Sequence, residues 1–452
     1  MAYSRYKAVN GGDTLYDFVL KNVRHYETNK TIAIAVKDGI ITAITEGMAN
    51  LPALSEEDGQ NDLVMPPFVE SHTHLDTVFT AGDPKWNKSG TIGEGISIWG
   101  ARKKYLTKKD VKDRVYRALH LLIVQGVLYV RAHVDISDPN LTALQAAVEA
   151  REEMKKYLHL QIVAFPQEGI VSCPGNKERL EEAIRLGADI VGAIPHLERT
   201  KECGVESLNI CFTLAKKYDC PIHIFCDEVD DPESKFLEIV ALKTIETGMQ
   251  GRVSASHANA FSLYDADYTD KLFSLLKKAQ INVIACPLIS SCSQGRSNSY
   301  PKFRGITRVK ELYEAGINVS IAHDDILTPF YPLGTGNILQ AAHMAVHVCH
   351  MSGRNEIEEI FNMVTKRPAK ALQIDNEYGL EEGKPANFIT LPVLNKTEAI
   401  RLQPTPALVI KNGRIIASTP RTESRLYIGQ THYRINRSYK QQKIAERNQF
   451  NP

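Results

Sequence analysis

The sequence has no uninterrupted apolar run of about 18 residues, the length that suggests a membrane-spanning helix. Its N-terminal segment has no basic start followed by an apolar stretch, so a standard export signal is not expected. The eight cysteines are scattered without a CxxC pair, which argues against a disulfide framework or a zinc ribbon. These absences predict a protein of the reducing cytoplasm without a membrane anchor.

An excess of charge of either sign is also missing. The 54 basic and 53 acidic residues nearly cancel, so the chain as a whole has no positive field that would attract nucleic acid or an anionic membrane. We therefore expect no nucleic-acid or membrane partner and a small neutral or zwitterionic substrate. With 452 residues, of which 43% are hydrophobic, the chain is long enough for a large core and a second, smaller domain.

The central region alternates apolar, strand-like runs with amphipathic stretches of helical period. Strand and helix in regular succession imply that the strands pair in parallel. Eight such units over about 300 residues predict a (β/α)8 TIM barrel over residues 67–374, and no GxGxxG motif follows the first run, as a dinucleotide-binding sheet would require. The eight runs are FVESHTH, VLYVRAHVD, LQIVAFPQ, DIVGAIP, PIHIFCDE, RVSASHA, INVIACPL and INVSIAHDD.

Short β-rich pieces lie on both sides of this region. TIAIAVKDGIITAI near the N-terminus and ALVIKNGRIIAS near the C-terminus have the residue types of strands and hairpin turns. We expect residues 1–66 and 375–430 to pair into one small, discontinuous β-sandwich domain. Residues 431–452 are polar and rich in charge, which predicts a solvated tail, with a contact in an oligomer as the alternative.

Polar residues that end the apolar runs are candidates for chemistry, because the active site of a (β/α)8 barrel lies at the carboxyl ends of its strands. His72 and His74 end the first run, and side chains two apart on a strand point to the same side. Asp324 ends the eighth run, which neighbours the first in a closed barrel, so its carboxylate can reach the same metal ion. An isolated histidine pair is more often a hydrogen-bonded core feature. Here His257 and His223 add imidazoles on two further runs, which favours a metal site.

Five motifs, FVESHTHLD, FPQEG, CDE, SHANA and AHDD, occur in this order on these strands, and further similarity extends from about Leu63 to Ser418. In this pattern the sequence resembles the cytosine deaminase branch of the amidohydrolase superfamily. The resemblance implies a metal-dependent hydrolytic deaminase that acts on cytosine or a related amino-substituted N-heterocycle and releases ammonia. It also implies a homo-oligomer. Relatives that hydrolyse isoguanine, creatinine or N-alkylated triazines leave the substrate open.

The resemblance implies roles for five residues in metal binding and catalysis. It assigns His72, His74 and Asp324 to one divalent ion, iron(II) or zinc, which activates a water. It assigns His257 to a hydrogen bond with that water and Glu228 to proton transfer, with Asp324 as the group that accepts the proton of the water. A glutamate in this role needs a raised pKa, which a dry barrel mouth provides. A second ion would need a bridging lysine at the end of the fourth run, and its absence predicts a single ion.

Substrate binding is assigned by the resemblance to residues beside these. Gln167, whose amide both donates and accepts hydrogen bonds, is expected to pair with the amide face of the substrate. Asp325 is expected to lie in the pocket. Phe330 matches a position where relatives carry Trp, and we expect it to form an apolar wall against the substrate ring, together with Phe165.

One position departs from the family pattern. Relatives carry a metal-binding histidine three residues before the glutamate, in HCDE, whereas this sequence has Phe225, which cannot bind a metal. His223 points to the same side of that strand but about 6–7 Å further down the barrel. It either replaces the missing ligand, which we predict, or is a buried and inert histidine. Cys226 would be a soft ligand only if the strand were distorted.

Two functions therefore remain open at this point. The main prediction is an active hydrolase, because the residues expected to carry the chemistry, Glu228, His257 and Asp324, are all retained. The alternative is a catalytically silent or metal-poor barrel that binds a pyrimidine-like ligand, because the usual metal-binding histidine of the fifth strand is Phe225.

Overall fold

The computed structural model describes residues 15–47, 51–429 and 431–435. The chain divides into two compact units, of which one is Phe68–Asn376 and the other combines Met1–Pro67 with Glu377–Pro452. Most of the predicted tail, residues 436–452, lies outside the described residues. No helix in the described part of the chain is long and apolar enough to cross a membrane.

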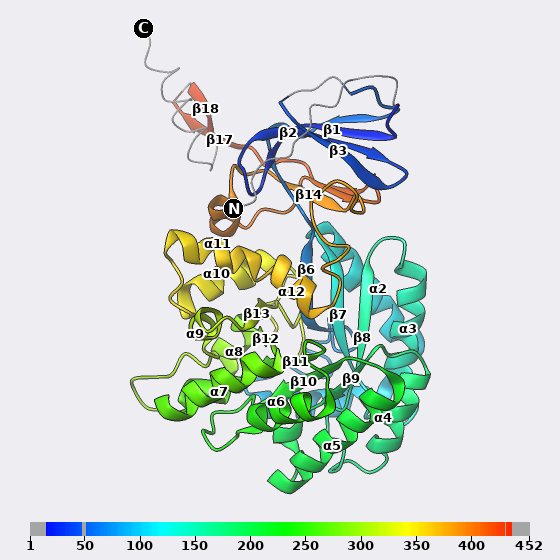
Figure 1. Ribbon diagram of the computed structural model, residues 1–452, viewed down its shortest axis with the longest axis vertical. Helices are drawn as coiled ribbons and strands as arrows, with labels where there is room; N and C mark the ends of the chain where they lie inside the picture. Colours follow the sequence, from blue (N-terminus) through cyan, green and yellow to red (C-terminus); the bar gives the residue numbers. More distant parts are fainter. Residues whose placement is uncertain (1–14, 48–50, 430, 436–452) are drawn as a thin grey trace. The chain divides into compact units, whose positions relative to one another are not determined.

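The larger unit is a barrel of eight strands, in the order β13-β12-β11-β10-β9-β8-β7-β6, with every neighbouring pair parallel. Each strand falls on one of the eight apolar runs, so the predicted (β/α)8 barrel is confirmed (Figure 1). The strands are β6 (Phe68–His74), β7 (Val127–Asp135), β8 (His159–Phe165), β9 (Ile190–Ala193), β10 (Ile222–Cys226), β11 (Val253–His257), β12 (Asn282–Ala285) and β13 (Asn318–Ile321).

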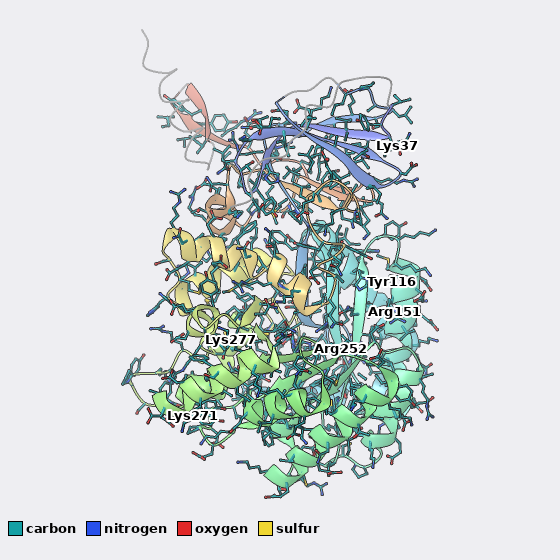
Figure 2. All side chains as sticks on the ribbon, viewed as in Figure 1. Lys37, Tyr116, Arg151, Arg252, Lys271 and Lys277 are labelled. Atoms are coloured by element: carbon teal, nitrogen blue, oxygen red, sulfur yellow. The ribbon has the colours of Figure 1, made fainter. Side chains whose placement is uncertain are left out.

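Helices follow the strands and surround them. The long outer helices are amphipathic, so one side packs on the strands and the other carries charge, as Figure 2 shows for Arg151 and Lys277. The helices are α1 (Ile92–Arg102), α2 (Lys108–Val124), α3 (Thr142–Met154), α4 (Asn176–Arg185), α5 (Lys201–Tyr218), α6 (Phe236–Thr247), α7 (Ala266–Ala279), α8 (Pro287–Ser293), α9 (Val309–Glu314), α10 (Ile338–Val348), α11 (Arg354–Asn362) and α12 (Lys366–Ala371), with short 3-10 turns η1 (Lys103–Tyr105), η2 (Pro195–Leu197) and η3 (Asn259–Leu263).

Side chains bridge the barrel between its first and last strands, β6 and β13. The buried Glu70 carboxylate accepts the backbone N–H of His72 at 3.1 Å and that of His323 at 3.0 Å. The Thr73 hydroxyl donates to the carbonyl of Asp324 at 2.7 Å. Burial raises the pKa of Glu70 to about 8. These bonds tie the backbone of the first run to that of the eighth at the carboxyl ends of the strands.

The smaller unit contains an eight-stranded mixed sheet with the order β16-β15-β14-β5-β1-β2-β3 and with β4 paired to β1. β14 pairs with β5, so segments from both ends of the chain share one sheet, as expected for a discontinuous domain. Asn412 and Gly413 both have positive φ in the turn between β15 and β16, which fits the predicted hairpin. The elements are β1 (Phe18–His25), β2 (Thr31–Lys37), β3 (Ile40–Glu46), β4 (Glu56–Asp58), β5 (Leu63–Met65), β14 (Phe388–Leu391), α13 (Lys396–Leu402), β15 (Leu408–Lys411) and β16 (Arg414–Ser418), followed by the hairpin β17 (Ser424–Ile428) and β18 (Thr431–Ile435).

Candidate metal and catalytic site

The backbone changes direction where three of the strands end. Asp227, His257 and Asp324 have φ angles of 52°, 67° and 70°, in the left-handed region that residues other than glycine seldom adopt. Such strained conformations persist where the surrounding structure holds them, and they are concentrated at functional sites. Here they turn the side chains of His257 and Asp324 towards each other across the barrel mouth.

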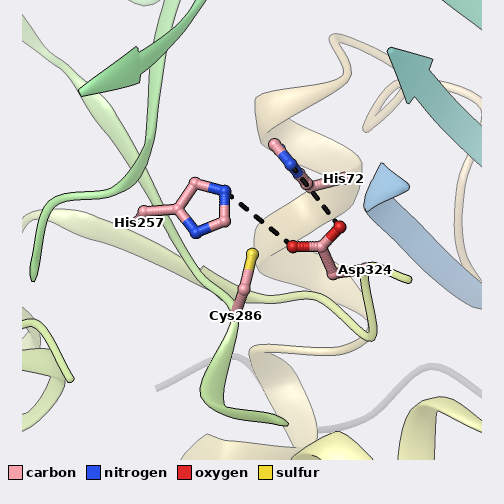
Figure 3. Close-up of side chains that lie close together, drawn as sticks. All are labelled: His72, His257, Cys286 and Asp324. Carbon is pink, nitrogen blue, oxygen red and sulfur yellow. Dashed lines mark ion pairs between the residues drawn. The ribbon is translucent and has the colours of Figure 1, made fainter. Parts of the chain in front are cut away.

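Three imidazoles converge on the carboxylate of Asp324. The Nε2 atoms of His72 and His74 each lie 3.8 Å from Asp324 Oδ1, and His257 Nε2 lies 3.8 Å from Asp324 Oδ2. Figure 3 shows the ion pairs that join His72 and His257 to this carboxylate. His72 Nε2, His257 Nε2 and Asp324 Oδ1 are buried and have no hydrogen-bond partner among the described residues.

These atoms have the chemistry and the spacing of a metal site. Imidazole nitrogens and carboxylate oxygens bind divalent ions at about 2.0–2.2 Å, so two ligand atoms of one ion stand about 3–4 Å apart. Buried polar atoms without partners are costly unless something satisfies them. The residues present therefore fit a divalent ion, with His72, His74 and Asp324 as the predicted ligands and His257 within reach.

A cysteine that the sequence analysis did not select lies beside this group. Cys286 follows β12, and its Sγ is within 4.8 Å of the ligand atoms of His72, His257 and Asp324 (Figure 3). Burial, followed by the neighbouring carboxylates, raises the pKa of the Cys286 thiol well above its usual value, which favours the neutral form. Cys286 lies near the end of the seventh run, INVIACPL, and a polar side chain at that position was the signal in the sequence.

Phe225 takes part in an aromatic stack next to the predicted metal ligands. Its ring stacks on Phe165 at 4.4 Å between centroids and on His257 at 4.7 Å, and its edge contacts His72 at 4.6 Å. Phe165 is 1% exposed. Its role in an apolar wall of the pocket stays a prediction, which this stack supports. The phenyl ring thus packs among the imidazoles at the position where the family resemblance led us to expect a histidine.

His223 and Phe225 both point into the barrel, as strand alternation predicts. His223 Nε2 lies 3.3 Å from His72 Nδ1, whereas His72 Nε2 faces Asp324. The two nitrogens of an imidazole point in widely diverging directions, so in this geometry His223 contacts the opposite edge of the ring from Asp324. The direct ligation by His223 remains a prediction. Cys226 Sγ instead lies 3.4 Å from Asp227 Oδ2, and Asp227 accepts the backbone N–H groups of Phe236 and Leu237 that begin α6.

Glu228 has the environment of a proton donor at neutral pH. Its side chain is 8% exposed, and Oε1 lies 3.4 Å from Nδ1 of His257. Burial, followed by the charge of Asp325, raises the pKa of Glu228 to about 8. The raised pKa agrees with the one expected from the sequence, and it keeps a protonated carboxyl group beside His257 at neutral pH.

Asp325 and Phe330 lie on the loop that follows β13. Burial raises the pKa of Asp325 to about 7, against a hydrogen bond from Thr328 that lowers it. Phe330 packs against α1 so closely that a Cβ added at Gly95 would stand 2.7 Å from its ring. His323 supports this loop, because its Nε2 accepts the backbone N–H groups of Thr335 and Gly336 at 3.2 and 3.1 Å. This agrees with a structural role for His323.

Gln167 lies on a second loop, which follows β8, and it is 8% exposed. The buried Glu198 carboxylate holds this loop by accepting the backbone N–H groups of residues 170–172 at 2.6 to 3.1 Å. Lys103 pairs with Glu168 and, at 3.2 Å, with the buried Asp135. Neither anchor could be predicted from the sequence, because nothing in the local pattern links residue 198 or 103 to this loop.

Comparisons with known proteins agree with this architecture. A profile of the amidohydrolase family matches residues 56–417. N-isopropylammelide isopropyl amidohydrolase from Pseudomonas sp. (strain ADP) is 31% identical over 407 residues, which cover 89% of this chain and 97% of the relative. Pterin deaminase from Rhizobium rhizogenes (strain K84) is 25% identical over 387 residues, or 85% of this chain and 87% of the relative.

A solved structure is similar at higher identity. The 5-methylcytosine deaminase from Klebsiella pneumoniae, liganded with 5-fluorocytosine, is 44% identical with a TM-score of 0.88, and the match covers 90% of this chain and 99% of that one. The fold, the strand-end motifs and these matches lead to the same conclusion. The chain belongs to the amidohydrolase family of enzymes.

Proposed function

We propose that the protein is a metal-dependent hydrolytic deaminase that removes the exocyclic amino group of cytosine or a close analogue, such as 5-methylcytosine. The observation that carries the proposal is the pairing of Asp324, which faces three imidazoles, with Glu228, a buried carboxyl group of raised pKa on the other side of His257. The 44% identity to a 5-methylcytosine deaminase supports the substrate class.

The proposed metal site supplies an activated water. When bound at His72, His74 and Asp324, a divalent ion lowers the pKa of water towards neutrality and provides the nucleophile. Iron(II) and zinc are the ions that the family resemblance favours. Two imidazoles and a carboxylate suit either ion.

The residues of the chain then move the protons. Asp324 accepts a proton from the attacking water, whose oxygen bonds to the ring carbon that bears the amino group. Glu228 donates its proton to the neighbouring ring nitrogen and then takes up the proton of the hydroxyl group formed on the ring carbon. It passes that proton to the amino group, the carbon–nitrogen bond breaks as ammonia leaves, and the proton held by Asp324 restores Glu228. His257, between the two carboxyl groups, orients the water. Water and a cytosine give a uracil and ammonia.

Substrate orientation is proposed to come from the two loops described above. Gln167 pairs with the amide edge of the heterocycle, because a primary amide offers a donor and an acceptor side by side. Asp325 contacts a ring N–H, while Phe330 and Phe165 provide apolar walls for the ring faces. Because Glu168 and Asp135 already neutralise Lys103, the pocket suits a neutral ring rather than an anion.

Ammonia release from a panel of heterocycles tests this function. The protein loaded with iron(II) or zinc would be incubated with cytosine, 5-methylcytosine, creatinine and N-isopropylammelide, and ammonia and isopropylamine would be measured. We expect ammonia from cytosine or 5-methylcytosine and no isopropylamine. Absence of ammonia from every compound would reject the proposal.

Phe225 favours one competing function, a silent barrel that binds a pyrimidine-like ligand. Phenylalanine removes a ligand of the family pattern, and its ring stacks on His257. Calorimetric binding of cytosine without ammonia release, together with no metal uptake on loading, would support this alternative.

The alkaline limb of the pH profile should depend on Asp325. Glu228 donates a proton only below its pKa of about 8, so turnover should fall as the pH rises through that value. Because the charge of Asp325 helps to raise this pKa, Asp325→Asn should move the limb of kcat to lower pH. Asp231→Asn, an exposed carboxylate nearby, is the control and should leave the limb unchanged. An unshifted limb in Asp325→Asn would show that the charge of Asp325 does not raise the pKa of Glu228.

A further inference from the structure

Three fully buried imidazoles lie together on the side of His72 away from Asp324. Ligand atoms of His72, His133 and His223 are within 4.8 Å of one another. The His133 ring lies 4.1 Å from that of His72 and 4.4 Å from that of His223. Neither nitrogen of His133, nor Nδ1 of His223, has a hydrogen-bond partner among the described residues. The single short contact between ring nitrogens is His72 Nδ1 to His223 Nε2, at 3.3 Å.

This cluster is a poor place for a cation of its own. It contains no carboxylate, and the guanidinium of Arg131, fully buried on β7, repels positive charge at all three rings. The opposite edge of His72 faces Asp324, whose negative charge attracts a cation. The electrostatics therefore favour an ion at Nε2 of His72, and they leave His133 and His223 as neutral rings behind it.

A neutral imidazole has one N–H and one nitrogen lone pair, and a metal ion takes the lone pair. If His72 offers Nε2 to an ion, its hydrogen is on Nδ1, the atom that faces His223. An N–H at that position needs an acceptor, because a buried donor without one costs free energy. His223 Nε2 is at the required place. As an acceptor it carries its own hydrogen on Nδ1, which has no partner among the described residues, whereas the other tautomer would set two N–H groups against each other across the 3.3 Å contact.

We propose that His223 is a positioning residue: its Nε2 accepts the Nδ1–H of His72 and so keeps the Nε2 lone pair of His72 directed at the metal ion. Partners of this kind are general for metal-binding histidines, where they fix the ring orientation and raise the basicity of the ligand. The proposal rests on the metal site of the proposed function, and it assigns His223 to the ring of a ligand rather than to the ion.

Zinc affinity of three proteins tests this assignment. The variants are His223→Leu, which removes the acceptor, and His223→Gln, whose side-chain oxygen can restore it. We expect zinc, measured by competition with a chromophoric chelator, to bind about 10–100-fold more weakly to His223→Leu and near the wild-type affinity to His223→Gln. His120→Leu, on the exposed face of α2, is the matched control and should bind as wild type does.

The visible spectrum of the cobalt(II)-substituted proteins supplies a second readout, because its bands depend on the number and type of ligands. The spectrum should be the same in wild type and both variants, since no ligand is lost. A changed spectrum and weak binding in both variants would show that His223 is itself a ligand, which overturns the proposal. Equal zinc affinity in all proteins, or no metal binding by the wild type, would overturn it as well. If His223→Leu does not fold, His223→Met provides the same contrast with His223→Gln.

Failure of the proposed function gives a different result, because these measurements contain no substrate. Tight zinc binding that depends on His223 in the expected way, without ammonia release from any heterocycle, would reject the deaminase and retain the positioning role. Ammonia release, with a zinc affinity that does not depend on residue 223, would retain the deaminase and reject the positioning role.

Discussion

Replacement of Glu228 by glutamine should lower kcat for ammonia release by roughly 10²–10⁴-fold, the usual contribution of a positioned acid or base. The amide keeps the shape of the side chain but cannot donate the proton that the ring nitrogen and the leaving group need. Metal content should stay at the wild-type value, because Glu228 approaches Nδ1 of His257 and is not one of the predicted ligands. Steady-state kinetics and elemental analysis of the same preparations provide the two measurements.

Stability offers a further check on this variant. Because burial raises the pKa of Glu228 to about 8, its ionisation costs the folded state free energy as the pH rises from about 4.5 to 8. The neutral amide avoids that cost, so Glu228→Gln should unfold at the same or a higher temperature at pH 8. Glu233→Gln, with 78% of its side chain exposed, is the control for the substitution itself. Wild-type turnover in Glu228→Gln would remove Glu228 from the mechanism.

Asp324→Asn should lose both the metal and the activity. Asp324 is the negative charge to which His72, His74 and His257 all point, and an amide neither neutralises a cation nor accepts the proton of the water. We expect metal content well below that of the wild type after identical loading, and a fall in kcat/KM of at least about 100-fold. Asp267→Asn, on the exposed start of α7, is the control and should change neither quantity.

The same variant should be more stable than the wild type when both are free of metal. Burial, followed by the charges of Asp325, Glu228 and Glu70, raises the pKa of Asp324 well above its usual value. A raised carboxyl pKa contributes stability at low pH that is lost as the pH increases, so the advantage of the asparagine should be larger at pH 8 than at pH 5. Thermal unfolding at the two pH values measures this. A metal-free variant that melts below the wild type at both would contradict it.

The strands could be predicted because each is a short apolar run closed by polar residues. β7 illustrates this, since all nine of its residues are buried and its run ends in His133 and Asp135. Alternation along β10 likewise placed His223 and Phe225 on the inner side, where their rings contact His72. The periodicity of apolar residues and the composition are local properties of the sequence, and they were sufficient to predict the barrel.

Contacts across the barrel could not be predicted in this way. The sequence places His223 on the inner face, but only the packed structure shows which edge of His72 it meets. His133 was part of a recognised run, yet its closeness to two other imidazoles depends on how three strands are staggered. The carboxylate of Glu70, in an apolar strand, accepts the backbone N–H of His323, a partner far along the chain that no local pattern identifies. Such pairings are set by tertiary geometry and leave no local pattern.

The bridge between β6 and β13 has a consequence for the order of folding. The residues that it joins, His323 and Glu70, are 253 positions apart. The predicted metal ligands come from the same two strand ends, His72 and His74 from β6 and Asp324 from the end of β13. An ion therefore cannot gather all its predicted ligands before residue 324 has been made and the first and last strands have met, and long-range contacts of this kind form slowly. Metal binding would thus select chains whose last strand has already met the first, and it would stabilise only that finished state.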